Sequence, residues 1–251
     1  MPPRQRTPEG PPPAPAVQKL RVQYARRGRL RFSSTRDFAR AIERGLRRAQ
    51  VPMAFSAGFH PHPKISYANG APTGTASEAE YFEISVTERV DPEAVRAALD
   101  EALPEGLDVV AVVEAAPGAL ADRLQASQWR LSFPGVSPAS LEAAVTAYLA
   151  VESAEVSRVF KTGPKTFDTR AAVLDMVTDA DPDNSCAILR MVVRHTTPSV
   201  RPDDILTALR AVSAFAPPVP PLVTRLAQGP LQADSAGVAD PLAADREAVG
   251  S

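Results

Sequence analysis

The sequence predicts an α+β protein with two tandem βαββαβ halves, flanked by disordered tails. Its 251 residues are enough for two domains of about 100 residues each. Within residues 18–228 the spacing of apolar residues switches between the period of a strand and that of a helix, in the same order twice. The halves show no sequence identity to each other, so the predicted repeat is one of topology only.

Residues 1–17 and 229–251 lack the apolar periodicity of the rest of the chain. The N-terminal stretch holds seven prolines, and the C-terminal stretch is rich in alanine, glycine and acidic residues. Segments that bury little apolar surface cannot offset the conformational entropy lost on ordering. We therefore expect a disordered Pro-rich N-terminal tail and a disordered Ala/Gly-rich acidic C-terminal tail.

The first half, residues 18–116, opens with a strand in which Leu20, Val22 and Tyr24 alternate with other residues. Ser34, with an acid three residues later, resembles a capping box that begins a helix. Pro92 favours the first position of a second helix. The expected order is strand 20–24, helix 34–49, a short apolar stretch at 51–56, a Gly/Pro loop to 77, strand 81–86, helix 91–103 and strand 107–113.

The second half, residues 127–228, follows the same order. Its two helices are predicted to begin at Ser137-Pro138 and at Arg201-Pro202, and a Pro- and Asn-containing turn at 181–184 predicts a hairpin. The expected order is strand 129–133, helix 137–150, strand 156–160, hairpin 171–178 with 187–194, helix 201–212 and strand 222–226. Split βαβ units of this kind are typical of ferredoxin-like folds, here written twice.

Charge is balanced overall and uneven along the chain. There are 28 Lys and Arg against 29 Asp and Glu, a net charge of −1. Residues 19–50 carry eleven Lys or Arg and two acids, a net of +9, and residues 91–122 carry eight acids and one arginine, a net of −7. The balance excludes a wholly basic nucleic-acid-binding protein, whereas the first segment predicts a local basic patch.

A row of arginines occupies one face of the first predicted helix. Arg36, Arg40, Arg44 and Arg47 fall opposite the apolar positions of that helix. Guanidinium groups at helical spacing can follow the phosphates of a nucleic acid. They can also form a solvated helix face, with or without ion pairs to the acids of the same chain. We name the four as candidate binding residues and keep both interpretations.

The loop at residues 55–67 concentrates polar groups between prolines. His60, His62 and Lys64 alternate with Pro61 and Pro63, which fix the backbone φ angle and leave little entropy to lose on binding. The loop therefore suits binding of a phosphate or a partner, and it also fits a purely structural turn. A metal site would need a third ligand that the loop itself does not contain, so none is predicted.

The same loop makes a family resemblance visible. The chain resembles the radical-SAM-associated proteins of the DUF2344 family over roughly residues 18–212. The matching motifs are Leu30-Arg31-Phe32-Ser33-Ser34, Gly58-Phe59-His60-Pro61-His62-Pro63-Lys64-Ile65-Ser66, Ser77-Glu78-Ala79-Glu80-Tyr81, Lys165-Thr166-Phe167-Asp168-Thr169-Arg170 and Arg201-Pro202-Asp203-Asp204. Ala171 departs from the family pattern, in which a proline follows the Asp-x-Arg, and residues 195–198 replace a Gly-rich turn.

The resemblance implies a partner more than an activity. Members of this family are encoded beside, or fused to, a radical-SAM protein, often near genes for ribonucleases and ribosomal proteins. The chain itself cannot hold a radical-SAM cluster, because that site takes three closely spaced cysteines and Cys186 is the only one here. A non-catalytic accessory protein of a radical-SAM enzyme, one that binds RNA or a ribonucleoprotein, fits both this family context and the basic helix, with tRNA or rRNA as the expected partner. No cofactor is expected.

An alternative is a stand-alone RNA-modifying enzyme with an architecture similar to that of pseudouridine synthases. Those enzymes use an essential Asp in a loop after the first helix–strand unit, and residues 56–64 contain none. Asp168 is the one carboxylate in a motif-like setting, so it is the candidate catalytic residue of this alternative. Lys165 and Arg170 flank it, are candidate binding residues, and would lower its pKa. An ion pair at the start of a strand is the simpler interpretation of Asp168.

Two features bear on location. No apolar run reaches the roughly 18 residues of a membrane-spanning helix. The first residues also lack the apolar core of a secretory signal. We therefore expect a cytoplasmic protein with no membrane partner.

Overall fold

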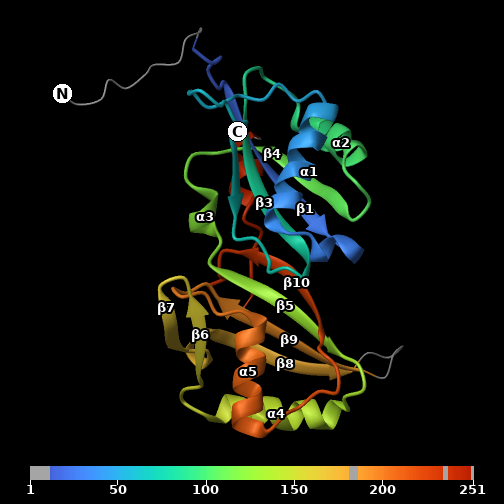
Figure 1. The fold of residues 1–251 in the computed structure, drawn as a ribbon, viewed down its shortest axis with the longest axis vertical. Coiled ribbons are helices and arrows are strands. Elements are labelled where there is room, and N and C mark those ends of the chain that lie inside the picture. The colour runs from blue at the N-terminus through green and yellow to red at the C-terminus, as the bar shows by residue number, and fades with distance from the viewer. Residues whose placement is uncertain (1–11, 181–185, 234–236, 250–251) are drawn as a thin grey trace, which may run out of the picture. The chain divides into compact units, whose positions relative to one another are not determined.

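The computed structural model describes residues 12–180, 186–233 and 237–249, which form a mixed α/β protein with mostly antiparallel strand pairing (Figure 1). Two compact units divide it. Unit 1 comprises the described residues of 1–73, 80–118 and 242–251, and unit 2 those of 74–79 and 119–241. Within the described part, no helix has the length and apolar character needed to cross a membrane.

Unit 1 contains a sheet with the strand order β4-β1-β3-β2, in which β4 pairs antiparallel with β1 and β2 antiparallel with β3. Its elements are β1 (Gln18–Arg26), η1 (Gly28–Phe32), α1 (Thr35–Arg48), β2 (Ile65–Ala68), β3 (Ala76–Val86), α2 (Pro92–Ala102), β4 (Leu107–Glu114) and α6 (Ala243–Val249). The first residues of β3 belong to unit 2.

The core of unit 1 lies between this sheet and the helices α1 and α2. Phe38, Ile42 and Leu46 of α1 are buried against strand residues, as the predicted apolar face requires. Gly45 lets α1 approach α2 closely, since a Cβ at this position would lie 2.7 Å from the Cδ2 atom of Leu103. The packed face of α1 is thereby fixed, and its opposite face is left to solvent.

Unit 2 contains an antiparallel sheet with the order β10-β5-β9-β8 and a separate hairpin of β6 and β7. Residues Ala76 and Ser77 of β3 pair in parallel with β10. The elements are α3 (Leu120–Arg123), β5 (Ala126–Phe133), α4 (Pro138–Ala150), β6 (Glu155–Phe160), β7 (Gly163–Asp168), η2 (Arg170–Ala172), β8 (Val173–Ala180), β9 (Ala187–Arg194), α5 (Pro202–Ser213) and β10 (Leu222–Gly229).

The core of unit 2 is built from the inner face of this sheet and from α4 and α5. Leu131 and Phe133 of β5 pack with Leu141 and Tyr148 of α4 and with Leu209 of α5. Both helices have a proline in their first turn, as the sequence indicates. Alternation along β5 points every second side chain into this core.

Three local predictions differ from the structure. The apolar stretch 51–56 makes only isolated bridges, through Met53 and Phe55. The second strand of unit 1 is instead β2, inside the segment predicted as loop. The strand β7 was not predicted, because glycine and proline begin it and its edge pairs only with β6. Residues 181–184, the predicted hairpin turn, fall within 181–185, which lie outside the described residues.

The prediction of a disordered C-terminal tail is wrong for most of its length. Leu231 bridges to Val238, and residues 243–249 form α6. Leu242 and Asp245 are completely buried in unit 1, so an apolar contact and an ion pair contribute to the order of a segment of low apolar content. At the other end, residues 1–11 of the predicted tail lie outside the described residues, and residues 12–17 are exposed and form no helix or strand.

Candidate nucleic-acid interface

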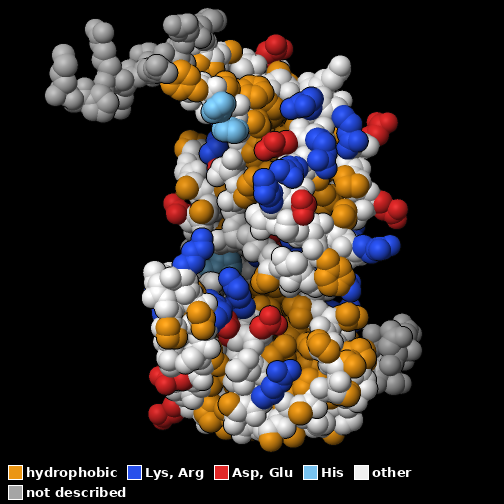
Figure 2. Space-filling view, viewed as in Figure 1, with side chains coloured by type: hydrophobic (Ala, Val, Ile, Leu, Met, Phe, Trp, Pro, Cys, Tyr) orange, Lys and Arg blue, Asp and Glu red, His pale blue; other side chains and the backbone are white. Residues whose placement is uncertain are grey.

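The arginine row lies on α1, whose geometry follows from its first turn and its packed face. The hydroxyl of Ser34 accepts the N–H of Asp37 and donates to the Asp37 carboxylate at 2.7 Å, which caps the helix. With the apolar face buried, Arg36, Arg40, Arg44 and Arg47 are all exposed. Figure 2 shows the Lys and Arg side chains gathered over α1.

These four guanidinium groups have no hydrogen bond or ion pair with any other described residue. Two acids of residues 91–122 pair with other arginines: Asp108 lies 2.7 Å from Arg27, and Glu114 lies 3.0 Å from Arg89. In the described part the row is therefore a solvated helix face without ion pairs to acids of the same chain. The row remains available to an external anion.

The loop that carries the histidines is closed at its base by backbone hydrogen bonds. The N–H of Ser56 donates to the carbonyl of His62 at 2.8 Å, and the N–H of His62 donates to the hydroxyl of Ser56 at 3.0 Å. Gly58 adopts a φ of +130°, a conformation that favours glycine. His60, His62 and Lys64 are all exposed and make no side-chain hydrogen bond or ion pair with described residues. They stand on the same unit as α1.

Aromatic side chains connect this loop region to the helix. Tyr67 of β2 packs edge-on against Phe38 of α1, with ring centroids 5.7 Å apart, and remains 40% exposed. Burial, and then the negative charge of Glu43, raise the pKa of Tyr67, which keeps the phenol neutral. Phe55 and Phe59 of the loop are 41% and 61% exposed. The basic face of unit 1, defined by α1, the loop and β2, thus combines cations with open aromatic rings.

A small pocket joins α1 to the base of the loop. Its volume is about 140 Å³, and its lining residues are Glu43, Leu46, Arg47, Val51, Met53, Phe55 and Pro63. Leu46, Val51, Met53 and Pro63 form apolar walls, whereas a carboxylate and a guanidinium stand at one side. The arginine row and the loop, which the sequence predicts separately, therefore share this pocket through Arg47 and Pro63.

No metal-binding cluster accompanies the histidines. In the ranges that the structure describes, no group of three or more His, Cys, Asp or Glu residues could hold an ion. His60 and His62 alone do not complete a zinc site.

The second set of predicted site residues lies in unit 2, around the end of β7. Lys165 is exposed, with its Nζ atom 5.7 Å from the centroid of the Phe160 ring. Arg170 is half-buried, and its Nη1 atom donates to the carbonyl of Val173 at 3.3 Å. The two cations do not form an ion pair with Asp168.

The carboxylate of Asp168 is hydrogen-bonded to the backbone around it. Its carboxylate accepts the N–H groups of Ala154 at 2.8 Å, Arg170 at 2.9 Å and Ala171 at 3.3 Å. Burial opposes ionisation, but these bonds, with one from the Ser153 hydroxyl, outweigh it and hold the pKa of Asp168 below its usual value. The pKa is lowered in the predicted direction, although backbone N–H groups rather than Lys165 and Arg170 are the cause. The carboxylate organises a turn.

The Arg-Pro-Asp-Asp motif is structural in a similar way. Asp204 accepts the N–H of Arg201 at 2.8 Å at the start of α5, and it pairs with Arg158 of β6 at 2.5 Å. Arg158 also donates to the carbonyl of Ser199 at 2.9 Å and lies over the Phe160 ring. The motif therefore joins the hairpin of β6 and β7 to α5.

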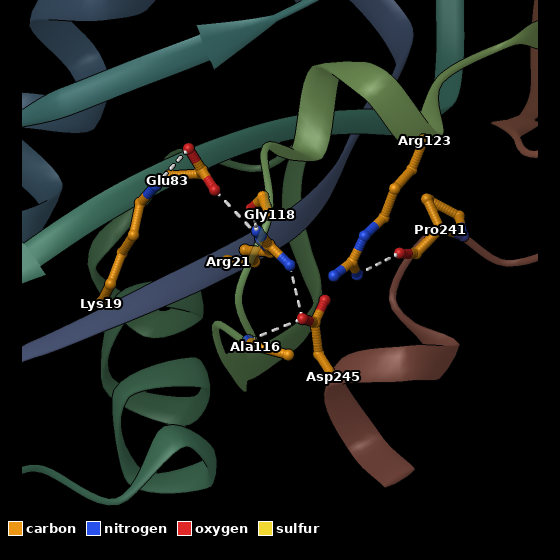
Figure 3. Close-up of polar contacts among 8 residues, drawn as sticks. All are labelled: Lys19, Arg21, Glu83, Ala116, Gly118, Arg123, Pro241 and Asp245. Atoms are coloured by element: carbon orange, nitrogen blue, oxygen red, sulfur yellow. Dashed lines mark hydrogen bonds and ion pairs between the residues drawn. The ribbon is translucent and has the colours of Figure 1, made fainter. Parts of the chain in front are cut away.

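Sequence reasoning missed a buried ionic site in unit 1. Figure 3 shows Arg21 between Glu83 and Asp245, with the Lys19 ammonium on the far side of Glu83. Arg21 and Asp245 are fully buried and 2.5 Å apart, and Arg21 is 3.0 Å from Glu83. Burial opposes charge on Glu83, but Lys19 and Arg21 outweigh it and lower its pKa. No sequence signal pairs Arg21 with Asp245, because 224 residues separate them.

A buried polar pair in unit 2 was missed as well. The Nδ1 atom of His195 lies 2.6 Å from the carbonyl of Leu124, and its Nε2 atom lies 2.7 Å from the hydroxyl of Ser127. A carbonyl only accepts, so Nδ1 donates and the Ser127 hydroxyl donates to Nε2. Burial, together with the charge of Arg225, lowers the pKa of His195 despite the bond to Leu124. Ser127 is 1% exposed, so this pair stabilises the fold and presents no open nucleophile.

Among the solved structures that are similar to the chain, two peroxidases show distant likeness. The encapsulated DyP-type peroxidase from Mycobacterium smegmatis is 9% identical, with 86% of this chain and 92% of that chain covered and a TM-score of 0.21. DyPB from Rhodococcus jostii is 13% identical, with 78% and 84% covered and a TM-score of 0.19. Likeness at this level carries no argument about fold or activity. No curated protein matches the chain.

A family comparison is informative. The sequence model of the DUF2344 family, described as an uncharacterized protein conserved in bacteria, matches residues 19–202. This range contains α1, the histidine loop and the whole of the pocket lining. It also includes the turn organised by Asp168 in unit 2. The chain therefore belongs to the DUF2344 family.

Proposed function

We propose that this protein is a non-catalytic, cytoplasmic accessory protein of a radical-SAM enzyme, and that it binds RNA or a ribonucleoprotein through the basic face of unit 1. The observation that carries the RNA half of the proposal is the row of four exposed guanidinium groups without an anionic partner in the described part of the chain. Phosphates are the partners that such a row suits.

Repulsion between the arginines of the row destabilises the isolated helix α1, and this supports the interpretation. Arg36 and Arg40, and Arg40 and Arg44, are like charges four residues apart, and each such pair destabilises a helix by about 0.2–0.5 kcal/mol. Glu43 offsets part of this repulsion. An anion lying along the row would remove the rest, so binding and helix stability are linked.

The fold part of the proposal is that each unit is ferredoxin-like. In unit 1 the strand order β4-β1-β3-β2 and the helices α1 and α2 support it. In unit 2 the order β10-β5-β9-β8 has the same pattern when the hairpin of β6 and β7 is treated as an insertion. Each sheet then carries two helices in the positions of a split βαβ unit.

The radical-SAM partner rests on the family context. The three cluster cysteines lie outside these 251 residues, whose single cysteine, Cys186, is buried. In this proposal the protein presents tRNA or rRNA to that enzyme. A stand-alone RNA-modifying enzyme gains no support from Asp168, whose two oxygens already accept backbone N–H groups.

Salt-dependent binding tests the RNA half. The protein is titrated with tRNA and rRNA fragments at several salt concentrations, as wild type and with the four row arginines changed to Gln. Each lost phosphate contact with a single strand lowers the slope of log K against log salt by about 0.7, so the slope should fall by roughly three. The control removes the same charge from exposed arginines outside the face: Arg89, Arg190, Arg194 and Arg210.

The proposal requires that the control variant keep the wild-type slope. Equal slopes in all three proteins, or no binding by the wild type, would contradict RNA binding by α1. For the partner half, gentle purification from cells should yield a radical-SAM protein and RNA together. If the radical-SAM protein co-purifies and no RNA is detected with it, the proposal that this protein presents RNA to that enzyme is contradicted.

A further inference from the structure

We infer that the basic face of unit 1 takes single-stranded RNA, and that the pocket between α1 and the loop receives one unpaired guanine base. This inference rests on the proposed function, since it specifies the kind of RNA bound by the same face. It is carried by the position of the exposed aromatic rings and by the chemistry of the pocket.

The exposed aromatic residues of the chain are concentrated on one segment. Among the large apolar side chains that the structure exposes, the aromatic ones are Phe32, Phe55, Phe59 and Tyr67. All four lie between residues 32 and 67, the same segment that carries the arginine row and the histidine loop. The exposed apolar residues elsewhere in the described ranges are Val and Leu.

Rings in this setting favour a single strand over a duplex. Bases in a duplex are stacked on one another, and their faces are closed to a protein, whereas an unpaired strand offers each face to an aromatic ring. Phe59 extends from a loop whose base is closed by hydrogen bonds, so little order has to be gained when a base stacks on it. The arginine row and Lys64 supply the charge that follows the backbone.

The pocket has the size and walls for one planar base. Its volume of about 140 Å³ is well below the roughly 300–1,000 Å³ of pockets that hold drug-sized ligands. Leu46 and Val51 are buried residues that form an apolar wall, and the partly exposed Phe55 adds an aromatic ring to the lining. Figure 2 shows hydrophobic side chains beside the Lys and Arg side chains on this face.

The two charged groups of the pocket match guanine. Glu43 and Arg47 are one helical turn apart on α1, and neither forms a hydrogen bond or ion pair with another described residue. A carboxylate only accepts and a guanidinium only donates. Guanine presents two adjacent donors, N1–H and the N2 amino group, beside the acceptor O6. Its pairing edge therefore fits Glu43 and Arg47 together, while adenine and uracil each offer a single donor there.

The test uses fluorescence anisotropy with four short RNAs: an oligouridine, the same strand with one central guanosine, the same strand with one central adenosine, and a duplex that contains the guanosine strand. Wild-type protein should bind the guanosine strand most tightly and the duplex most weakly. A strand with adenosine in place of guanosine is the matched control for the base.

Three variants separate the parts of the inference. Phe59→Ala should weaken binding of all single strands by at least about fivefold, whereas Val159→Ala, which removes an exposed apolar side chain of unit 2, should not. Glu43→Gln should reduce the preference for guanosine over adenosine by about tenfold, and it should not weaken oligouridine binding, because it removes a negative charge beside the row. Circular dichroism of each variant establishes that it is folded.

The outcomes distinguish this inference from the proposed function. Duplex binding as tight as single-strand binding, wild-type affinity in folded Phe59→Ala, or equal affinity for guanosine and adenosine strands would overturn the inference and leave RNA binding intact. Absence of any arginine-dependent RNA binding would overturn both. Binding of an acidic protein partner at this face, with no competition by any of the RNAs, would also overturn both.

Discussion

Replacing Asp245 by Ala should destabilise unit 1 strongly, because it leaves Arg21 buried with only one of its two carboxylate partners, Glu83. Arg21 and Asp245 are both fully buried, and the Asp245 carboxylate also accepts the N–H of Ala116 at 2.8 Å. The substitution therefore breaks an ion pair and a backbone hydrogen bond in the same place. It also removes the ion pair that links α6 to β1.

The size of the effect follows from what remains around Arg21. Removing one partner of a buried pair typically costs about 3–5 kcal/mol. Glu83, 12% exposed, still contacts the guanidinium at 3.0 Å, and the carbonyl of Gly118 still accepts from it. We therefore expect Asp245→Ala to lower the free energy of unfolding by about 3 kcal/mol, the lower end of that range.

Urea unfolding followed by far-UV circular dichroism measures this change. With a slope of about 3 kcal/mol per M, the upper end for small domains, the midpoint should fall by about 1 M. Asp108→Ala is the matched control, because it breaks a pair with Arg27 in which both side chains are 40–50% exposed. Such a pair contributes at most about 1 kcal/mol.

The reasoning would be refuted if Asp245→Ala shifted the midpoint no more than Asp108→Ala does. A further check is the double variant Arg21→Met with Asp245→Ala. It should recover part of the lost stability, because an apolar side chain in place of the unpaired guanidinium removes a buried charge. A double variant less stable than either single one would also contradict the account.

Three other predictions concern single sites. Gly229→Ala should cost about 1–3 kcal/mol, because its Cβ would overlap the carbonyl oxygen of Ala239, whereas Gly70→Ala, with 3.8 Å to the nearest side-chain atom, should leave the melting temperature nearly unchanged. An NMR titration should give His195 a pKa below 6.5. The lowered pKa contributes stability that is present above pH 6.5 and is lost as the pH falls through the pKa of the folded state. A measured pKa at or above 6.5 would refute this prediction. Asp168 likewise contributes stability above pH 3.8, and this stability is lost as the pH falls through its lowered pKa. The urea midpoint of Asp168→Asn should therefore fall less on acidification than that of the wild type. Identical dependence of the two midpoints on pH would count against the turn organised by Asp168.

Local patterns predicted most of the helices and strands, because local spacing decides them. The capped, one-sided helix α1 is an example, since both Ser34 and the apolar period lie within the helix sequence itself. The strand β2 was missed because it has four residues, too few to show a period, and it follows a proline. The helix α6 was missed because its order depends on Asp245 meeting Arg21, a contact that no local pattern contains.

The candidate site was predictable in part for the same reason. Helical spacing alone predicts that the four row arginines are exposed. The net charge of +9 over residues 19–50 overstates the basic patch, because Arg21 and Arg26 of that segment are buried. The pocket was not predictable, since it requires α1 and Pro63 to meet in space. The bonds of Asp168 to backbone N–H groups were equally hidden, because sequence shows neighbouring cations and not the path of the backbone.

Mapping the contact by ultraviolet crosslinking tests the central claim most directly. Wild-type protein is bound to a guanosine-containing single strand, irradiated and digested, and the crosslinked peptides are identified by mass spectrometry. The account predicts crosslinks within residues 32–67, with Phe55, Phe59 or Tyr67 at the modified positions, and their loss in the variant that lacks the four row arginines. Crosslinks confined to residues outside 32–67, or unchanged in that variant, would contradict it.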